Sequence, residues 1–388
     1  MKSYLECGDV RQCCSCRACE QVCPKQCITM VQKNGFLYPV VDEEKCVKCG
    51  LCIQVCQFSG QGIEMKRKAL DVFAGWNKKK EQIEQSTSGG IFPVLAEYVI
   101  EQGGYVFGAA FNEQLVVNMQ MINDKKDISM VQGSKYVRSD TNTTYRQVKN
   151  LLEKEEKVLY SGTPCQIAGL KSYLRKDYEK LICVDLICHG VPTELLFEKY
   201  KEYIERTNNL KITSFRFRSK KAGVMSSEYC IKLSNGKEIR EALSKNPYSL
   251  TYNSLIAHMP SCNSCPYTSL QRVSDITIGD FWGIEKIDPM AVNPRGTSLI
   301  FVNSRKGQNI IEEVKQELEL FQEKGEDAQR FNPPLRHSTK KHPMSEKFIK
   351  ELAEKPFEKV YKKYIYWGNK WMLFYRLIRK IKEKLIRE

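Results

Sequence analysis

The sequence predicts a mixed α/β protein with an α+β tendency in its second half. It divides into a small N-terminal module, a larger body and a basic amphipathic C-terminal helix. Eleven of the 17 cysteines fall within the first 56 residues. From residue 71 onward, strand-like and helix-like segments alternate. Residues 364–387 carry apolar residues at helical spacing with basic residues between them.

Length and composition narrow the class of protein. The chain has 388 residues, of which 42% are hydrophobic, so two or three domains with real cores are expected. It contains no run of about 18 apolar residues that would span a bilayer. Because Met1–Cys7 also lacks the features of a signal peptide, we expect a cytoplasmic protein, in which cysteines bind metal rather than form disulfides.

The N-terminal cysteines form two identical runs of the pattern C-x-x-C-x-x-C-x-x-x-C. The second run repeats the first with an offset of 33 residues, which predicts two half-modules related by a pseudo-two-fold axis. In two-cluster ferredoxins the fourth cysteine of each run ligates the other cluster. The predicted ligands of two 4Fe-4S clusters are therefore Cys13, Cys16, Cys19 and Cys56 for one, and Cys46, Cys49, Cys52 and Cys23 for the other. Two structural zinc sites are the alternative, although these usually take two widely separated pairs.

The residues around these runs are typical of the same kind of module. Short strands are expected at 28–30 and 38–41 with a turn at 33–35, and the module resembles a bacterial dicluster ferredoxin over residues 1–63. Gln57 departs from the pattern, because a proline usually follows the fourth cysteine. The three cysteines outside the runs are expected to be small buried apolar residues: Cys7, Cys14 and Cys27. A charged linker is expected at 64–70.

The body alternates between the two kinds of periodicity. Strands are expected at 71–76, 105–111, 116–122, 157–160, 181–187, 213–218, 229–233, 275–279 and 298–303. Helices are expected at 91–102, 141–153, 166–174, 194–206 and 308–321. The predicted regions are 71–150, 151–310 and a helical extension at 311–388.

Four loops with glycine or small polar residues interrupt the body. They lie at 85–90, 132–138, 161–166 and 275–283. The first precedes a helix, and its small residues suit a phosphate at a positive helix terminus. Each loop taken alone is equally typical of an ordinary turn.

A second group of cysteines is dispersed through the body. Cys165 and Cys188 each follow an expected strand, so adjacent parallel strands would bring them to one edge of a sheet. The pair Cys262 and Cys265 would then complete four ligands for a third 4Fe-4S cluster. The alternative is buried free cysteines plus a zinc-like knuckle. Cys183 and Cys230 lie inside expected strands and are expected in the core.

The ordered motifs resemble one known family. Ser88-Gly89-Gly90, Gln132–Val137, Gly162–Gln166, Cys188–Pro192 and Asp275–Gly283 are similar to the beta subunit family of coenzyme F420 hydrogenases and dehydrogenases, over about residues 70–305. The resemblance implies an oxidoreductase that uses FAD with iron–sulfur clusters. Clusters carry single electrons and the flavin delivers a pair, here to a deazaflavin or another small acceptor. A relay subunit without catalysis is the alternative.

The resemblance also implies a set of site residues. FAD phosphates are expected near Ser88, Gly89, Gly90, Gly133 and Ser134, with Lys135 and Arg138 as countercharges. Gly162, Thr163 and Asp280 are further candidates for the cofactor site, and Trp282 for its lining. His189 and Lys135 are the catalytic candidates, the histidine as a proton donor. The alternatives are a solvated turn for the two cations, a structural histidine and a core tryptophan.

The basic charge is concentrated at the end of the chain. Residues 359–388 carry ten basic and two acidic residues of a chain with net charge +15. A helix at 364–387 would suit either an anionic membrane surface or a docking site on protein. Nucleic acid is not expected as a partner, since no recognised binding fold accompanies the charge. A ferredoxin or a hydrogenase or dehydrogenase subunit is the expected redox partner.

Overall fold

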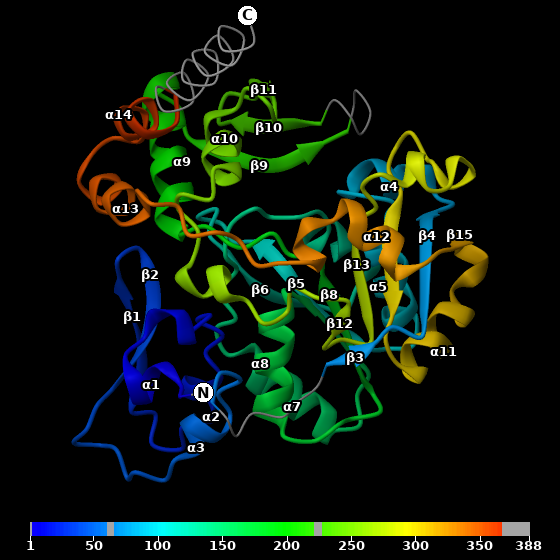
Figure 1. Cartoon of the computed structure of the whole chain (residues 1–388), viewed down its shortest axis with the longest axis horizontal. Helices are drawn as coiled ribbons and strands as arrows, with labels where there is room; N and C mark the ends of the chain where they lie inside the picture. The colour runs from blue at the N-terminus through cyan, green and yellow to red at the C-terminus, as the bar shows by residue number, and fades with distance from the viewer. Residues whose placement is uncertain (1, 60–65, 221–226, 367–388) are drawn as a thin grey trace, which may run out of the picture.

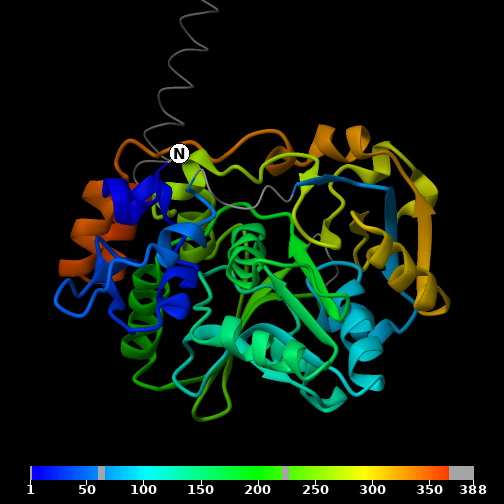
Figure 2. The same cartoon turned by 90° about the horizontal axis from the view of Figure 1, so that it is seen from below.

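A computed structural model describes residues 2–59, 66–220 and 227–366. It has an N-terminal module, a domain around a large sheet, and a smaller helical and β subdomain that includes the last described helices (Figures 1 and 2). The mixed α/β fold with an N-terminal cysteine module is as the sequence predicts. The predicted helix at 364–387 lies almost entirely outside the described residues.

The N-terminal module contains one hairpin and three short helices. The hairpin pairs β1 (Ile28–Lys33) with β2 (Phe36–Val41), and its two turn residues, Asn34 and Gly35, have φ of 51° and 78°. Such a left-handed pair matches the twist of the flanking strands, and Asn-Gly supplies it with little strain. The helices are α1 (Tyr4–Cys7), α2 (Ala18–Val22) and α3 (Leu51–Gln54), with the turn η1 (Val10–Gln12).

The body is built on an eight-stranded mixed sheet. In spatial order its strands are β15 (Leu318–Gln322), β4 (Asp71–Asn77), β14 (Ser298–Val302), β13 (Ile276–Asp280), β8 (Leu181–Leu186), β7 (Val158–Gly162), β5 (Tyr105–Phe111) and β6 (Val117–Ile122). The four strands β13, β8, β7 and β5 are parallel. Their carboxyl ends therefore meet at one edge, where α/β sheets usually bind ligands.

Helices cover both faces of this sheet. On one face, α5 (Ile91–Glu101) and α11 (Arg305–Glu313) pack on Leu159 and Val184. On the other face, α7 (Thr144–Glu153) and α8 (Pro164–Leu174) pack on Val158 and Tyr160. The alternation of neighbouring strand residues between the faces gives both β7 and β8 fully buried sequences.

A three-stranded antiparallel sheet forms the smaller subdomain. Its order is β11 (Glu238–Ala242), β10 (Glu228–Leu233) and β9 (Ile212–Ser219). An aromatic core that includes Phe197, Phe215 and Tyr248 joins it to α9 (Glu194–Asn208), α10 (Pro247–Asn253), α13 (Ser345–Glu354) and α14 (Phe357–Tyr361). This core accounts for the α+β tendency of the second half.

The remaining elements are short. They are β3 (Arg67–Lys68), which pairs with β12 (Gln271–Arg272), α4 (Lys80–Gln85), α6 (Ile128–Val131), α12 (Gly325–Phe331) and single turns η2 (Lys125–Asp127), η4 (Pro260–Ser264), η5 (Ile284–Lys286), η6 (Pro289–Ala291), η7 (Lys315–Glu317), η8 (Pro333–Leu335) and η9 (Lys362–Tyr366). The expected linker at 64–70 thus includes a strand at its described end.

One predicted helix is partly wrong. The segment 308–321 is helical only as far as Glu313, where α11 ends, and its last residues begin the edge strand β15. Leu318 and Leu320 alternate with polar residues and pair with Asn77 and Gly75 of β4. The apolar spacing of the segment fits a helix and a strand equally, and pairing with a free sheet edge decides the outcome.

The module is fixed to the body by ion pairs and hydrogen bonds. Arg17 binds both oxygens of Asp140 at 2.5 and 2.6 Å. Thr141 donates to the carbonyl of Cys16 at 2.9 Å, and Arg138 donates to the carbonyl of Ser15 at 3.0 Å. Burial alone would raise the pKa of Asp140, but the Arg17 hydrogen bond and the charge of Arg138 lower it below its usual range.

Candidate cofactor sites

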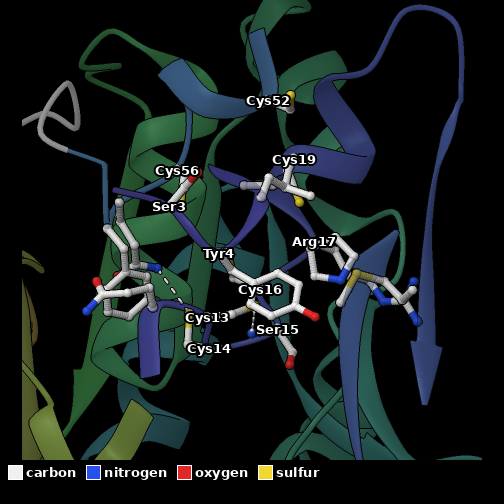
Figure 3. A pocket seen from close by; sticks show the side chains of 17 residues that line it. Ser3, Tyr4, Cys13, Cys14, Ser15, Cys16, Arg17, Cys19, Cys52 and Cys56 are labelled. Atoms are coloured by element: carbon white, nitrogen blue, oxygen red, sulfur yellow. Dashed lines mark hydrogen bonds between the residues drawn. The ribbon is translucent and has the colours of Figure 1, made fainter. Parts of the chain in front are cut away.

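Four cysteine sulfurs surround one pocket in the N-terminal module. Figure 3 shows Cys13, Cys16, Cys19 and Cys56 along its wall. Burial raises the pKa of Cys13 to about 12, and the nearby sulfurs of Cys16 and Cys56 raise it further. The structure therefore brings the last cysteine of the second run to the first three of the first run.

The sequence repeat is also a repeat of backbone conformation. The amides of Ser15 and Lys48 each donate to the sulfur two residues earlier, Cys13 and Cys46, at 3.4 Å. Both donors have φ of 55°. Hydrogen bonds of this kind to ligand sulfurs help to set the potential of an iron–sulfur cluster.

The second set gathers around Cys52. Burial raises the pKa of Cys52, and Cys49 and Cys23 lie close enough to raise it further. Cys23 therefore lies with the second run, as the exchange of fourth ligands requires. Cys27 is buried, as expected, but its sulfur lies 3.3 Å from that of Cys23, so a fifth thiol borders this set.

The dispersed cysteines of the body form a third set. Cys165 begins α8 directly after β7, and Cys188 follows the parallel neighbour β8. Burial raises the pKa of Cys188 to about 12, with Cys165 and Cys265 adding to it, and burial and Cys188 raise the pKa of Cys262. All four thiols therefore lie within electrostatic reach of one another at the carboxyl ends of the sheet.

These thiols fit an iron–sulfur cluster by two criteria. The amide of Gly190, at φ 92°, donates to the sulfur of Cys188 at 3.4 Å, as Ser15 and Lys48 do in the module. The raised pKa values show that buried thiolates here need positive charge, which cluster iron supplies. Among the described residues, no group of three or more His, Cys, Asp or Glu side chains is arranged to hold a metal ion.

The first and third sets meet at α8. Gly169 lies one turn after Cys165, and a Cβ on it would stand 2.9 Å from both Cβ and Sγ of Cys16. The absence of a side chain at this position is what allows the module to approach the helix so closely.

Gly169→Ala is expected to displace the module from α8. The added methyl group overlaps Cys16, and overpacking of this kind typically costs about 1–3 kcal/mol. Iron analysis of reconstituted protein should show a loss of up to about four irons per chain. In the control Gly325→Ala, no atom lies closer than 3.4 Å to the new methyl group, so iron content should not change. Equal iron in both variants would contradict a tight contact at Cys16.

The loops predicted to bind phosphates also lie together. The amide of Ser134 donates to Thr87 Oγ1 at 2.7 Å, and the Gln132 amide donates to Ser86 Oγ at 2.7 Å. The amide of Gly89 is engaged with Ser298 at 2.9 Å, because a Cβ at Gly89 would collide with the carbonyl of Gly75. Gly89 therefore has a packing role, and Gly90, at φ 80°, begins α5.

Four cations converge beside these loops. Lys220 donates to the carbonyls of Ile83 at 3.1 Å and of Ser88, and desolvation and then Arg218 lower its pKa to about 7. Desolvation and the charge of Arg216 likewise lower the pKa of Lys135 to about 7. Depressed lysine pKa values beside further cations indicate a site that stabilises an anion.

Sequence reasoning missed Arg218 and Lys220. Both follow the alternation Phe-Arg-Phe-Arg in β9, whose phenylalanines are buried, so the arginines lie on the opposite face. Arg218 forms an ion pair of 2.5 Å with Asp280. By contrast, Arg138, expected as a phosphate countercharge, is buried and ion-paired to Glu194 at 2.5 Å. Its guanidinium holds the module to the body.

The remaining predicted residues lie between the third set and the cations. Thr163 caps α8 and its hydroxyl lies 3.2 Å from the sulfur of Cys165, directly after Gly162. The His189 ring lies 4.7 Å from that of Trp282, which is 42% exposed and so is not a core residue. Burial lowers the pKa of His189, and Asp280 opposes that shift. Of the three other cysteines, Cys230 is half-buried and Cys7 is exposed, contrary to expectation, whereas Cys183 is buried.

The paired cysteine runs on this fold define an iron–sulfur protein of the electron-transfer class. Residues 12–59 match the model of the 4Fe-4S dicluster domain. Residues 155–327 match the model of the C terminus of the coenzyme F420 hydrogenase/dehydrogenase beta subunit. The chain therefore joins a dicluster domain to the C-terminal domain of that beta subunit family, which confirms the resemblance seen in the motifs.

Two further comparisons were made. A chain of the F420-reducing [NiFe] hydrogenase complex from Methanosarcina barkeri is similar in structure, with a TM-score of 0.46 and 17% identity over 77% of this chain and 93% of that chain. No curated protein sequence matches. Within residues 2–59, 66–220 and 227–366, no helix is long and apolar enough to cross a membrane.

Proposed function

We propose that this protein is an iron–sulfur flavoprotein oxidoreductase that links one-electron carriers to a two-electron acceptor. Three 4Fe-4S clusters would be held by the three cysteine sets, and FAD by the loops and cations beside the third. A flavin supplies the conversion between single electrons and electron pairs. The observation that carries the proposal is the position of the third cysteine set, which contacts the module on one side and borders His189 on the other.

The chain's own groups have distinct roles in this proposal. Lys135, Arg216, Arg218 and Lys220 would neutralise the FAD phosphates, and the amide and hydroxyl groups of Ser88 and Ser134 would orient them. Asp280 holds Arg218 in place. His189 is kept neutral by burial and stacks on Trp282, so it is positioned to exchange a proton with a bound acceptor.

The beta subunit family points to a coenzyme F420-type deazaflavin as the acceptor and to hydrogenase or dehydrogenase subunits as partners. A ferredoxin is an alternative donor, since the dicluster domain exposes Cys49 to solvent. The second candidate, a relay subunit without catalysis, shares the clusters but not the flavin. Cofactor analysis separates the two.

Anaerobically reconstituted protein is expected to hold about one FAD per chain. Lys135 and Lys220 are charged only below a pKa of about 7, so FAD should bind more tightly at pH 6 than at pH 8.5. Affinity should change about tenfold for each unit by which the bound anion raises a lysine pKa. Equilibrium dialysis measures both quantities.

The variant Lys135→Met should bind FAD more weakly and with a flatter pH dependence. Lys125→Met is the matched control, because Lys125 is exposed and pairs with Glu101 on the surface. A reconstituted chain with full iron and no FAD at either pH would leave only the relay function.

A further inference from the structure

Gln57 is the residue at which the second cysteine run departs from the first. Pro24 follows Cys23 in the first run, whereas Gln57 follows Cys56 in the second. Its side chain leaves the module: the amide nitrogen donates to the carbonyl of Cys165 at 2.6 Å. It also donates to the sulfur of Cys14 at 3.3 Å.

The same side chain reaches the other arm of the third cysteine set. The hydroxyl of Tyr267, two residues after Cys265, donates to Gln57 Oε1. One glutamine thus connects a predicted ligand of the first cluster, through the peptide that follows it, to the loops of two predicted ligands of the third. Tyr267 is buried, so water does not compete for this contact.

Cys14 fills the space between the two sets. Its thiol lies within hydrogen-bonding reach of the sulfurs of Cys16 and Cys165, one from each set. Hydrogen bonding from Cys14 lowers the pKa of Cys16, to about 7, and also that of Cys165. A single side chain therefore separates a sulfur of the first set from a sulfur of the third.

We propose that Gln57 and Cys14 form the electron-transfer contact between the first and third clusters, which rests on the function proposed above. Electron tunnelling weakens with distance and is faster through bonded and hydrogen-bonded atoms than through gaps. One electron leaves the cluster at Cys13, Cys16, Cys19 and Cys56, which is oxidised, and enters the cluster at Cys165, Cys188, Cys262 and Cys265, which is reduced. No bond or proton changes place, and a one-electron donor protein supplies the electron.

This contact also orders the sites. The set at Cys46, Cys49, Cys52 and Cys23 has no member in the contact, so it lies on the outer side as the entry point. Gln57 is a positioning residue: it holds Cys14 and the Cys165 loop at a fixed separation. A proline at 57, as in the first run, would keep the turn but lose all three of its side-chain hydrogen bonds.

The test uses the full-length reconstituted protein mixed anaerobically with reduced ferredoxin. In Gln57→Leu and Gln57→Pro, freeze-quench EPR should show the third cluster becoming reduced about tenfold more slowly, as is typical for loss of outer-shell contacts. Iron content, the midpoint potentials of the module clusters and the ferredoxin concentration for half-maximal rate should stay at wild-type values. Cys14→Ala should slow the same step.

Gln54→Leu is the matched control. Gln54 lies three residues earlier in the same module and also contacts the body, through Arg175 of the α8 C-terminus. It should keep the wild-type rate, which separates the contact at Gln57 from general loosening of the module. Wild-type rates in both Gln57 variants, with full iron and flavin, would overturn the inference. Wild-type protein with only the module clusters would instead overturn the proposed function.

Discussion

Cys262→Ala is expected to remove the third cluster and leave the module clusters intact. The wild-type protein should hold about twelve irons per chain and the variant about eight. Cys262 lies among three other thiols that raise its pKa after burial does, so its loss leaves an incomplete ligand set in a buried site. Delivery of electrons from a ferredoxin to FAD should fall by about 100-fold or more, beyond the usual effect of outer-shell changes.

Cys230→Ala provides the comparison for this substitution. Cys230 is a half-buried residue of β10 in the smaller sheet and belongs to none of the three sets. The control should keep all the iron and the full rate of electron delivery. Eight irons in wild type, unchanged by Cys262→Ala, would show that the body holds no cluster. Iron, labile sulfide and EPR on the same samples give the answer.

The sequence predicted the parts of these sites that depend on local spacing. The two N-terminal runs carry their ligands within a few residues, and their common backbone turns at Ser15 and Lys48 follow from that spacing. Cys165 and Cys188 were placed together because parallel neighbouring strands end at one edge, and β7 and β8 are such neighbours.

The rest depends on contacts between distant segments, which leave little local signal. Arg218 meets Asp280 across two sheets, and Gln57 meets Cys165 across the boundary between module and body. Arg138 shows the converse error: its place in a glycine-containing loop suggested a phosphate ligand, but burial against the module engages its charge. The edge strand β15 was missed because only pairing with β4 separates it from a helix.

Arg272→Met is expected to cause the largest loss of stability in the body. Arg272 and Asp185 are 2% and 0% exposed and form an ion pair of 3.2 Å. Removal of one partner from a buried pair typically costs about 3–5 kcal/mol, because the other charge stays buried and unpaired. The surface pair of Arg295 and Glu84, at 3.1 Å, is the control, and Arg295→Met should cost about 1 kcal/mol or less. Anaerobic guanidinium unfolding gives the apparent midpoints.

The same guanidinium positions the third cysteine set. It donates to the carbonyl of Leu186, two residues before Cys188, and to that of Tyr267, two residues after Cys265, both at 2.9 Å. Arg272→Met should therefore also speed the loss of iron from this set under a chelator, whereas Arg295→Met should not.

The pH dependence of this variant identifies the charge that is left behind. Burial raises the pKa of Asp185 even with Arg272 present, and its loss should raise that pKa further. A carboxyl whose folded pKa is raised stabilises the fold when protonated, and this stability is lost as pH rises through the folded pKa. The difference in unfolding midpoint between variant and wild type should thus be smaller at pH 6 than at pH 8. A difference independent of pH would mean that lost packing, rather than an unpaired carboxylate, causes the instability.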